Sequence, residues 1–335
     1  MLQINRQWIF SQVPGPGPIK SSCFDYQENN LCELKEGEYL VKNKLLSFDP
    51  TQRMWMQADT YVPKIPLGSV MRSLALGEVI KSKNKKIKEG TRLTGLFGWQ
   101  EYSIRTGHDF FPDVHVSEGV SDEAAMSVFG LTGLTAYFGM KTIGHVKKGD
   151  AVLVSGASGA TGSVAAQIAR LEGASKVIGI AGGQKKCAWL REKAKLDEVI
   201  DYKSESIFDQ IKKYAPEGID LFFDNVGGAT LDAALLNLNL GARVVLCGAI
   251  SAYEGTSDPA IRNYMSLVLK RASMRGFLFS DHLHLMEEAI SKLGAWVESG
   301  ELCFEVDLQS GLENAPETLQ RLFDGKNFGK QLLKI

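Results

Sequence analysis

The chain has 335 residues, a formal net charge of −1, 44% hydrophobic residues and 23% charged residues. This composition is that of a globular protein, and the length exceeds what one ordinary hydrophobic core accommodates, so we expect two domains. The balanced charge excludes an electrostatic basis for binding nucleic acid or an anionic membrane surface.

The five cysteines are scattered and never form a C-x-x-C pair. This spacing favours a reducing compartment and argues against a disulfide framework. The first residues, MLQINRQWIFSQ, lack the apolar segment of a signal peptide, and no stretch approaches the roughly 18 apolar residues of a membrane-spanning helix. We therefore expect a cytoplasmic protein that neither enters nor crosses a membrane.

The first third of the chain is rich in short β-like runs separated by Gly, Pro and Lys turns. The runs are residues 38–45, 77–81, 92–97 and 101–104. Short strands at close spacing predict a small, barrel-like all-β domain over residues 1–121. Within it, the Pro-Gly-Pro-Gly-Pro run at 14–18 is incompatible with a helix or a central strand and predicts an extended surface arm.

The pattern changes at Ser121, where Ser121-Asp122-Glu123 predicts a helix N-cap followed by acidic residues in the first turn. A second helical stretch covers residues 131–140. Beyond it, strand-like and helical segments alternate, which predicts a doubly wound parallel sheet over residues 122–301. The predicted strands are 151–154, 176–181, 199–201, 219–224, 243–248 and 274–279, and the predicted helices include 207–214 and 231–238. Residues 302–308 and 330–335 are again β-like, so the chain is expected to return to the first domain over 302–335.

The most informative stretch is residues 151–171, AVLVSGASGATGSVAAQIARL. A buried strand, a turn of small residues and an amphipathic helix follow one another, as in the first half of a dinucleotide-binding βαβ unit. The turn, Ala157-x-Gly159-x-x-Gly162, is the G-x-G-x-x-G pattern with alanine at its first position. Small residues there permit a tight turn, close approach of a pyrophosphate and close packing of helix on strand.

The end of the next strand indicates which dinucleotide is bound. NAD-binding folds place Asp or Glu there, about 20 residues after the glycine turn, to hold the ribose 2′-hydroxyl. Here the strand at 176–181 is followed by Gly182, Gly183, Gln184, Lys185 and Lys186. Two lysines and no acid favour a 2′-phosphate, so the sequence predicts NADP(H). An ordinary solvated helix start is the alternative interpretation of the two lysines.

Several further motifs, in a fixed order, resemble the medium-chain dehydrogenase/reductase superfamily. Within it, the chain is similar to the zinc-independent, NADP-dependent 2-alkenal and prostaglandin reductases, which are leukotriene B4 dehydrogenase-like. The motifs are Phe48-Asp49-Pro50 with Arg53, the segment 70–79 (VMRSLALGEV), 131–139 (LTGLTAYFG), 223–228 (FDNVGG), 247–253 (CGAISAY) and 325–330 (GKNFGK). Many members have Tyr-Met where this chain has Thr51-Gln52, so the family's substrate size does not carry over.

The resemblance implies a GroES-like β-barrel domain (1–121, with the return 302–335), a Rossmann-like domain (122–301) and a cleft between them. It implies hydride transfer from NADPH to the β-carbon of an α,β-unsaturated aldehyde or ketone, and a homodimer. Tyr253 matches the family's active-site tyrosine. The cofactor-binding residues it implies are Ala157, Gly159, Ala160, Thr161, Gly162, Gly182, Lys186, Tyr202, Asn225, Cys247, Gly248, Ile250 and Asn327.

The reaction class also follows from the ligands that the sequence lacks. Zinc relatives need a thiolate with His or Glu ligands, and a cluster of four cysteines for a structural zinc. Residues 84–118 contain no cysteine, so we expect no metal. Direct carbonyl reduction then lacks its usual electrophile. Conjugate reduction requires only that a hydroxyl stabilise an enolate, and Tyr253 is the candidate for that hydroxyl.

Two other functions stay open at this stage. A zinc-free quinone reductase of the same superfamily would share the glycine turn. A dinucleotide-binding scaffold or sensor would bind NADPH without turnover. NADPH oxidation measured across alkenals, enones and quinones distinguishes the three.

Overall fold

The computed structural model describes residues 4–107 and 110–335. The chain divides into two compact units. One comprises the residues up to Met126 together with Val306–Ile335, and the other comprises Ser127–Glu305. We describe each unit by itself.

The first unit is built on a seven-stranded sheet. Six strands follow one another in the order β14-β15-β3-β4-β5-β7, and the seventh, β6, pairs with β3. Strand β15 pairs with β3 in antiparallel and with β14 in parallel orientation, so the C-terminal residues complete a sheet begun near the N-terminus. A hairpin of β1 and β2 forms a separate two-stranded sheet. The bounds are β1 Ile4–Phe10, β2 Phe24–Asn30, β3 Tyr39–Ser47, β4 Ala75–Ser82, β5 Arg92–Gly95, β6 Tyr102–Arg105, β7 Val114–His115, β14 Val306–Ser310 and β15 Lys330–Lys334.

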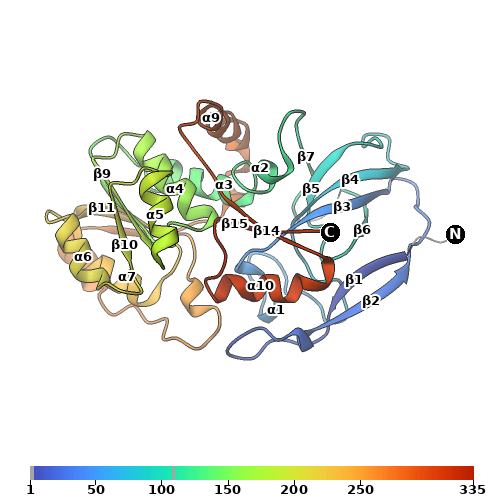
Figure 1. Ribbon diagram of the computed structural model, residues 1–335, viewed down its shortest axis with the longest axis horizontal. Helices are drawn as coiled ribbons and strands as arrows, with labels where there is room; N and C mark the ends of the chain where they lie inside the picture. Colours follow the sequence, from blue (N-terminus) through green and yellow to red (C-terminus); the bar gives the residue numbers. More distant parts are fainter. Residues whose placement is uncertain (1–3, 108–109) are drawn as a thin grey trace. The chain divides into compact units, whose positions relative to one another are not determined.

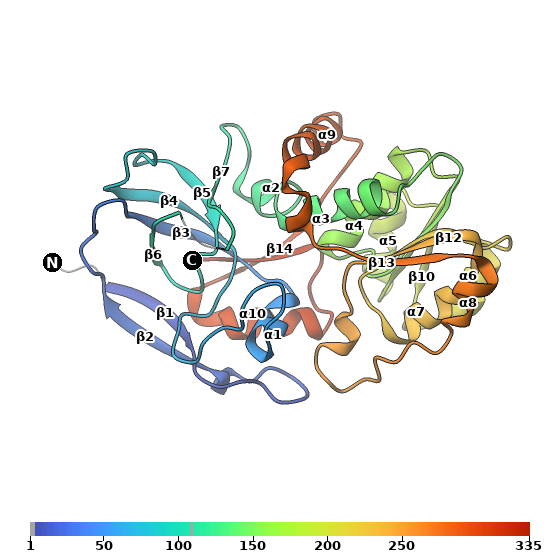
Figure 2. The same cartoon turned by 180° about the vertical axis from the view of Figure 1, so that it is seen from behind.

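Two helices of this unit lie in segments for which the sequence analysis expects only strands or nothing regular. They are α1 (Thr51–Gln57) and α10 (Ala315–Phe323), which lie side by side in Figures 1 and 2. The buried guanidinium of Arg53 lies 5.8 Å from the ring centroid of Phe323 and joins them. The short α2 (Asp122–Met126) also belongs here, and the Ser121 hydroxyl accepts a hydrogen bond from the Ala124 N–H, as the N-cap pattern predicts.

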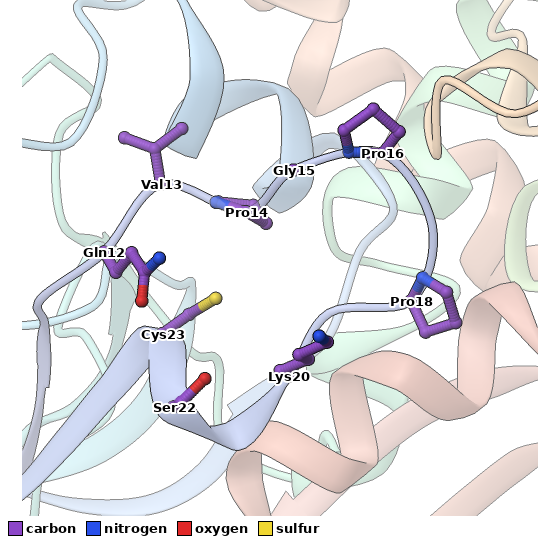
Figure 3. Close-up of a pocket in the computed structure, with 9 residues that line it drawn as sticks. All are labelled: Gln12, Val13, Pro14, Gly15, Pro16, Pro18, Lys20, Ser22 and Cys23. Atoms are coloured by element: carbon purple, nitrogen blue, oxygen red, sulfur yellow. The ribbon is translucent and has the colours of Figure 1, made fainter.

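The proline-rich arm at 14–18 belongs to no helix or strand and curves between β1 and β2 (Figure 3). Arg53 Nη2 donates to the carbonyl oxygen of Gly15 at 2.7 Å. Pro14 and Gly17 are buried while Pro16 and Pro18 are exposed, so the arm is only partly a surface feature. The cavity that it encloses has a volume of about 140 Å³, which is too small for a drug-sized ligand.

The second unit is a parallel sheet in the order β10-β9-β8-β11-β12-β13. Its core consists of apolar strand residues such as Leu153, Ile178 and Phe222 packed against the connecting helices. The doubly wound fold class is confirmed. The strands are β8 Ala151–Val154, β9 Lys176–Ala181, β10 Glu198–Asp201, β11 Ile219–Asp224, β12 Leu238–Leu246 and β13 Ser273–Gly276. The helices are α3 Leu131–Tyr137, α4 Ala160–Leu171, α5 Gln184–Glu192, α6 Ile207–Tyr214, α7 Gly228–Leu235, α8 Met265–Lys270 and α9 Met286–Glu298.

Several predicted boundaries in this unit are wrong: β12 begins at Leu238 instead of 243, and α7 begins at Gly228 instead of 231. The helix predicted to reach residue 238 ends at Leu235, because β12 begins at Leu238 and pairs with Ile219 through a β-bulge. Strand β12 ends at Leu246 instead of 248, because the N–H groups of Cys247 and Gly248 both donate to the Asp224 carbonyl and turn the chain. Strand β13 ends at Gly276, and residues 279–285 form a 3₁₀ helix.

The predicted helix over 131–140 is α3 followed by a π-helical segment, Phe138–Ile143. Gly139 lies against the rings of Phe223 and Phe277, where any Cβ would overlap them, so the helix packs closely on the sheet. Within residues 4–107 and 110–335, none of the helices combines the length and the apolar character that crossing a membrane requires.

Candidate active site

The order of the parallel strands marks the place where a ligand is expected. From β8 the chain proceeds to β9 and β10 on one side and then crosses back to β11 on the other side of β8. The adjacent carboxyl ends of β8 and β11 therefore form the topological switch point, where open α/β sheets bind their ligands. The predicted turn residues follow these strands and their neighbours.

The turn after β8 has the geometry of a phosphate-binding turn. Gly156 has φ +58°, and the Gly159 N–H donates to its carbonyl at 2.9 Å. Gly159 is the N-cap of α4, so no side chain caps this helix, and the first turn contains no acidic residue. The N–H groups of Ala160, Thr161 and Gly162 stand at the positive end of the helix dipole, where they can bind an anion.

Close packing explains the last glycine of the pattern. A Cβ on Gly162 would overlap the Gly156 carbonyl oxygen and lie 2.8 Å from the carbonyl carbon, so only glycine fits. Ala157 is fully buried, and its N–H donates to the Ile180 carbonyl of β9 at 2.9 Å. The turn is therefore held between two strands and leaves its small-residue surface for a dinucleotide pyrophosphate, so the residues present fit that group.

Hydrogen bonds join the turn after β8 to the turn after β11. The Ser155 hydroxyl donates to Asp224 Oδ1 at 2.7 Å and accepts the Asn225 N–H at 2.8 Å. Asn225 Nδ2 donates to the Ser155 carbonyl at 2.7 Å. Ser155 and Asp224 are both fully buried. The predicted cofactor residue Asn225 thus lies at the switch point, and its amide nitrogen fastens the two turns together.

Asp224 and Cys247 have perturbed protonation equilibria for a shared reason. Burial raises the pKa of Asp224. Three hydrogen bonds to its carboxylate, from the Ser155 hydroxyl and from the N–H groups of Val226 and Gly227, lower the pKa and offset part of this effect. Burial, and secondarily the nearby Asp224 charge, raise the pKa of the Cys247 thiol to about 12. Cys247 is therefore a neutral thiol at physiological pH and a poor nucleophile.

Tyr253 follows β12 by way of the short 3₁₀ helix Ile250–Ala252. Its hydroxyl accepts the N–H of Ala249 at 3.1 Å, and a Cβ on Gly248 would lie only 3.2 Å from it. The Ile250 N–H donates to the Asn225 carbonyl at 3.2 Å. Four of the predicted residues, Asn225, Gly248, Ile250 and Tyr253, are thereby brought into one cluster at the carboxyl ends of β11 and β12.

The turn after β9 brings two more predicted residues into contact. Gly182 follows β9 directly and lies against the ring of Tyr202, which follows β10 and is 49% exposed. Lys185 and Lys186 occupy the first turn of α5, which again contains no acidic residue. Of the predicted 2′-phosphate residues, Gly182 and Tyr202 are therefore in contact just after β9 and β10, and Lys186 lies in α5, the helix that follows β9.

Asn327 is the predicted site residue that belongs to the other unit. It precedes β15, and its Nδ2 donates to the Gly329 carbonyl at 3.2 Å. Thr51, also in that unit, shares a 2.9 Å hydrogen bond with Tyr61, and Gln52 is buried with its amide bonded to the Arg72 carbonyl and the Asp49 N–H. Gln52 is therefore a structural residue of the first turn of α1.

No sequence motif singles out Ser155. A usable signal does exist. Ser155 directly follows β8, and β11 ends in the acidic residue Asp224. If β8 and β11 flank the switch point, their carboxyl ends are adjacent, and the serine hydroxyl can reach the carboxylate. Among the described residues, no group of three or more His, Cys, Asp or Glu side chains is arranged to hold a metal ion.

Comparison with known proteins agrees with this arrangement. Residues 6–112 match the model of the family described as the N-terminal domain of oxidoreductase, and residues 160–296 match that of zinc-binding dehydrogenase. The NADPH-dependent curcumin reductase of Escherichia coli is 33% identical, with 99% of this chain and 97% of that protein covered. The NADP⁺-dependent 2-alkenal reductase of Nicotiana tabacum is 36% identical, with 89% and 87% covered.

The solved structure of CurA from Vibrio vulnificus in complex with NADPH has a TM-score of 0.91 to this chain. The two are 35% identical, and the match covers 98% of each chain. The likeness therefore spans both units of the present chain.

Proposed function

Since the chain belongs to the zinc-independent, NADP-dependent reductases of the medium-chain dehydrogenase/reductase superfamily, we propose that it reduces the C=C bond of α,β-unsaturated aldehydes or ketones. One observation within the chain carries the proposal. The start of α4, which no side chain caps, and the start of α5, which contains two lysines and no acidic residue, lie beside the switch point. Tyr253 lies there as well. Relatives named for curcumin and 2-alkenals support the substrate class, because both compounds contain a C=C bond conjugated to a carbonyl.

Different residues of the second unit are proposed to bind different parts of NADPH. The N–H groups at the start of α4 bind the pyrophosphate, and Lys186 binds the 2′-phosphate with the ring of Tyr202 beside it. Asn225, Cys247, Gly248 and Ile250 line the turns nearest the switch point. Asn327 is a further cofactor residue that only the family resemblance implies. When bound, the cofactor supplies the hydride.

Tyr253 is the proposed catalytic residue. Its oxygen accepts the Ala249 N–H, and a phenol hydroxyl is also a hydrogen-bond donor. Donation to the substrate's carbonyl oxygen stabilises the negative charge that develops there as the double bond is reduced. The interaction strengthens in the transition state, so it lowers the barrier more than it tightens substrate binding.

The test is the rate of NADPH oxidation by the purified protein with a 2-alkenal, the matching saturated aldehyde and a quinone. We expect the alkenal to be reduced and the saturated aldehyde to be inert, with the saturated aldehyde as the product of the alkenal reaction. Treatment with a chelator should leave the rate unchanged. Turnover of the quinone alone would assign the protein to quinone reduction, and no turnover of any electrophile would favour a scaffold.

We also infer a homodimer. Strand β13 is the last strand of the six-stranded sheet, so one edge of it is unpaired within the described part of the chain. Helix α8 precedes it and exposes large apolar side chains, with Val268 64% and Leu269 71% exposed. An open edge beside exposed apolar residues is costly in a monomer, and a second copy pairing on it in a twofold arrangement would bury both.

A further inference from the structure

The main chain beyond β12 is hydrogen-bonded to the turn that follows β11. The N–H groups of Cys247 and Gly248 donate to the Asp224 carbonyl oxygen at 2.8 and 3.1 Å. The Ile250 N–H donates to the Asn225 carbonyl oxygen at 3.2 Å. Strand β12 has already ended where these contacts begin. The turn after β11 therefore directs the chain once the sheet no longer does.

Two further contacts continue this alignment. The Ser251 N–H and hydroxyl both donate to the Val226 carbonyl oxygen, at 3.2 and 2.6 Å. Beside them, a Cβ on Gly227, which has φ +72°, would lie 3.1 Å from the Ala249 Cβ, so the two segments are in close contact. Ala249 is the residue whose N–H holds the Tyr253 hydroxyl. The segment that places this hydroxyl thus packs along the turn after β11.

The carboxylate of Asp224 holds the turn after β11 in its shape. Its Oδ1 accepts the Ser155 hydroxyl at 2.7 Å and the Val226 N–H at 3.0 Å. The Gly227 N–H lies 3.1 Å from each of the two carboxylate oxygens. Asp224 is fully buried, and within residues 4–107 and 110–335 no cationic side chain pairs with it. These donors therefore stabilise the buried charge, and the charge in turn orders the main chain that supplies them.

We propose that Asp224 is a positioning residue for Tyr253. Its carboxylate fixes the turn after β11, and the carbonyl groups of that turn place the segment that holds the tyrosine hydroxyl. The inference rests on the proposed catalytic role of Tyr253. Because both carboxylate oxygens are engaged by donors of the protein, Asp224 acts through the main chain and not by contact with substrate.

The first experiment needs neither cofactor nor substrate. Asp224→Asn keeps the size of the side chain, but its amide group faces a main-chain N–H with a donor of its own, and the remaining bonds lose the charge of the carboxylate. Hydrogen exchange of the purified protein is followed by mass spectrometry. We expect the peptide covering residues 247–253 to exchange at least tenfold faster than in the wild type. Unchanged exchange of this peptide would overturn the proposal.

Asp220→Asn is the matched control. Asp220 lies near the amino end of the same strand, and its carboxylate also binds the main chain of β8, accepting the Ala151 N–H at 2.8 Å. It accepts Asn239 Nδ2 at 2.9 Å as well. This variant should leave both kcat and the exchange of residues 247–253 as in the wild type. Equally fast exchange in the two variants would indicate a general loosening of the sheet and would contradict a specific role for Asp224.

A double-mutant cycle separates positioning from stability. Asp224→Asn should lower kcat for a simple enone at least tenfold at saturating NADPH. In the Tyr253→Phe background the same substitution should lower kcat less than twofold, because the hydroxyl that it would displace is absent. Equal losses in both backgrounds would refute the positioning role. A wild-type protein that turns over no enone would contradict the proposed function, which is a separate outcome, and the exchange measurement still decides whether Asp224 orders the segment.

A second variant leaves the buried carboxylate intact. Ser251→Ala removes the 2.6 Å bond from the Ser251 hydroxyl to the Val226 carbonyl oxygen and so weakens the same link from the other side. We expect faster exchange of residues 247–253 and a several-fold lower kcat, with the loss of kcat again absent in the Tyr253→Phe background. If neither quantity changes, the turn after β11 does not position the tyrosine.

Discussion

The hydroxyl oxygen of Tyr253 accepts a hydrogen bond from the backbone N–H of Ala249 at 3.1 Å. This bond holds the hydroxyl at the carboxyl end of β12. Gly248 gives the hydroxyl room, because a Cβ there would lie 3.2 Å from the same oxygen. The tyrosine hydroxyl is thus held by a main-chain donor.

Replacing this tyrosine tests its catalytic role. Loss of one donor to a developing oxyanion costs about 2.7–4 kcal/mol, and the ribose hydroxyl of the cofactor can share the task, so Tyr253→Phe should lower kcat for a simple enone by about 10²-fold. NADPH affinity, measured by fluorescence titration, should change little. An unchanged kcat would remove Tyr253 from the mechanism.

Lys186, at the start of α5, should determine the affinity for the 2′-phosphate of NADPH. Loss of a charged hydrogen bond costs about 1.5–3 kcal/mol, so Lys186→Ala should raise the KM for NADPH roughly 10- to 100-fold with little change in kcat. The KM for NADH is the internal control and should hardly move. A parallel rise in both KM values would show that the substitution disturbs the turn in general.

Ser155 should contribute to stability through the bonds that join β8 to β11. Ser155→Ala removes a 2.7 Å hydrogen bond to buried Asp224 and leaves the Asn225 N–H without its 2.8 Å acceptor. We expect the free energy of unfolding in urea to fall by about 1–3 kcal/mol. Ser163→Ala is the matched control, because Ser163 is also buried but its hydroxyl makes only a 3.4 Å bond. An equal loss from both variants would contradict the role given to Ser155.

The Cys247 thiol should resist the electrophiles that the enzyme is proposed to reduce. Its pKa of about 12 means that the reactive thiolate is scarce between pH 7 and 9 and becomes abundant only as the pH approaches 12. After incubation with a 2-alkenal without NADPH, peptide mapping should find the adduct on exposed Cys32 before Cys247. Adduct formation on Cys247 at pH 8 as fast as on Cys32 would show that its thiol is not protected.

The exposed face of α8 should control assembly. Val268→Lys combined with Leu269→Lys places two charges among apolar residues, so the variant should be monomeric in light scattering if β13 and α8 form the dimer interface. Leu67→Lys, at a position 59% exposed in the other unit, is the control and should leave the mass unchanged. A wild-type protein that is itself monomeric would refute the dimer.

Local sequence determined much of the second unit. Strands β8, β9 and β11 and helix α6 have the bounds predicted from apolar runs and helical periodicity. The glycine turn was recognisable because its requirements are local: small residues, a strand before it and a helix after it. The acid-free turn after β9 likewise predicted NADP(H), in agreement with the NADPH-dependent relatives.

Tertiary structure alone decided what depends on residues far apart in the chain. Ser155 and Asp224 are 69 positions apart, and their bond exists because β8 and β11 are adjacent in the sheet. The start of β12 at Leu238 follows from pairing with Ile219 and not from any pattern of its own. Gly182 reads locally as a flexible turn residue, and only the pairing of β10 with β9 brings the ring of Tyr202 against it. Periodicity reports which face of an element is buried, whereas the neighbour that covers that face is set by the packing of the whole sheet.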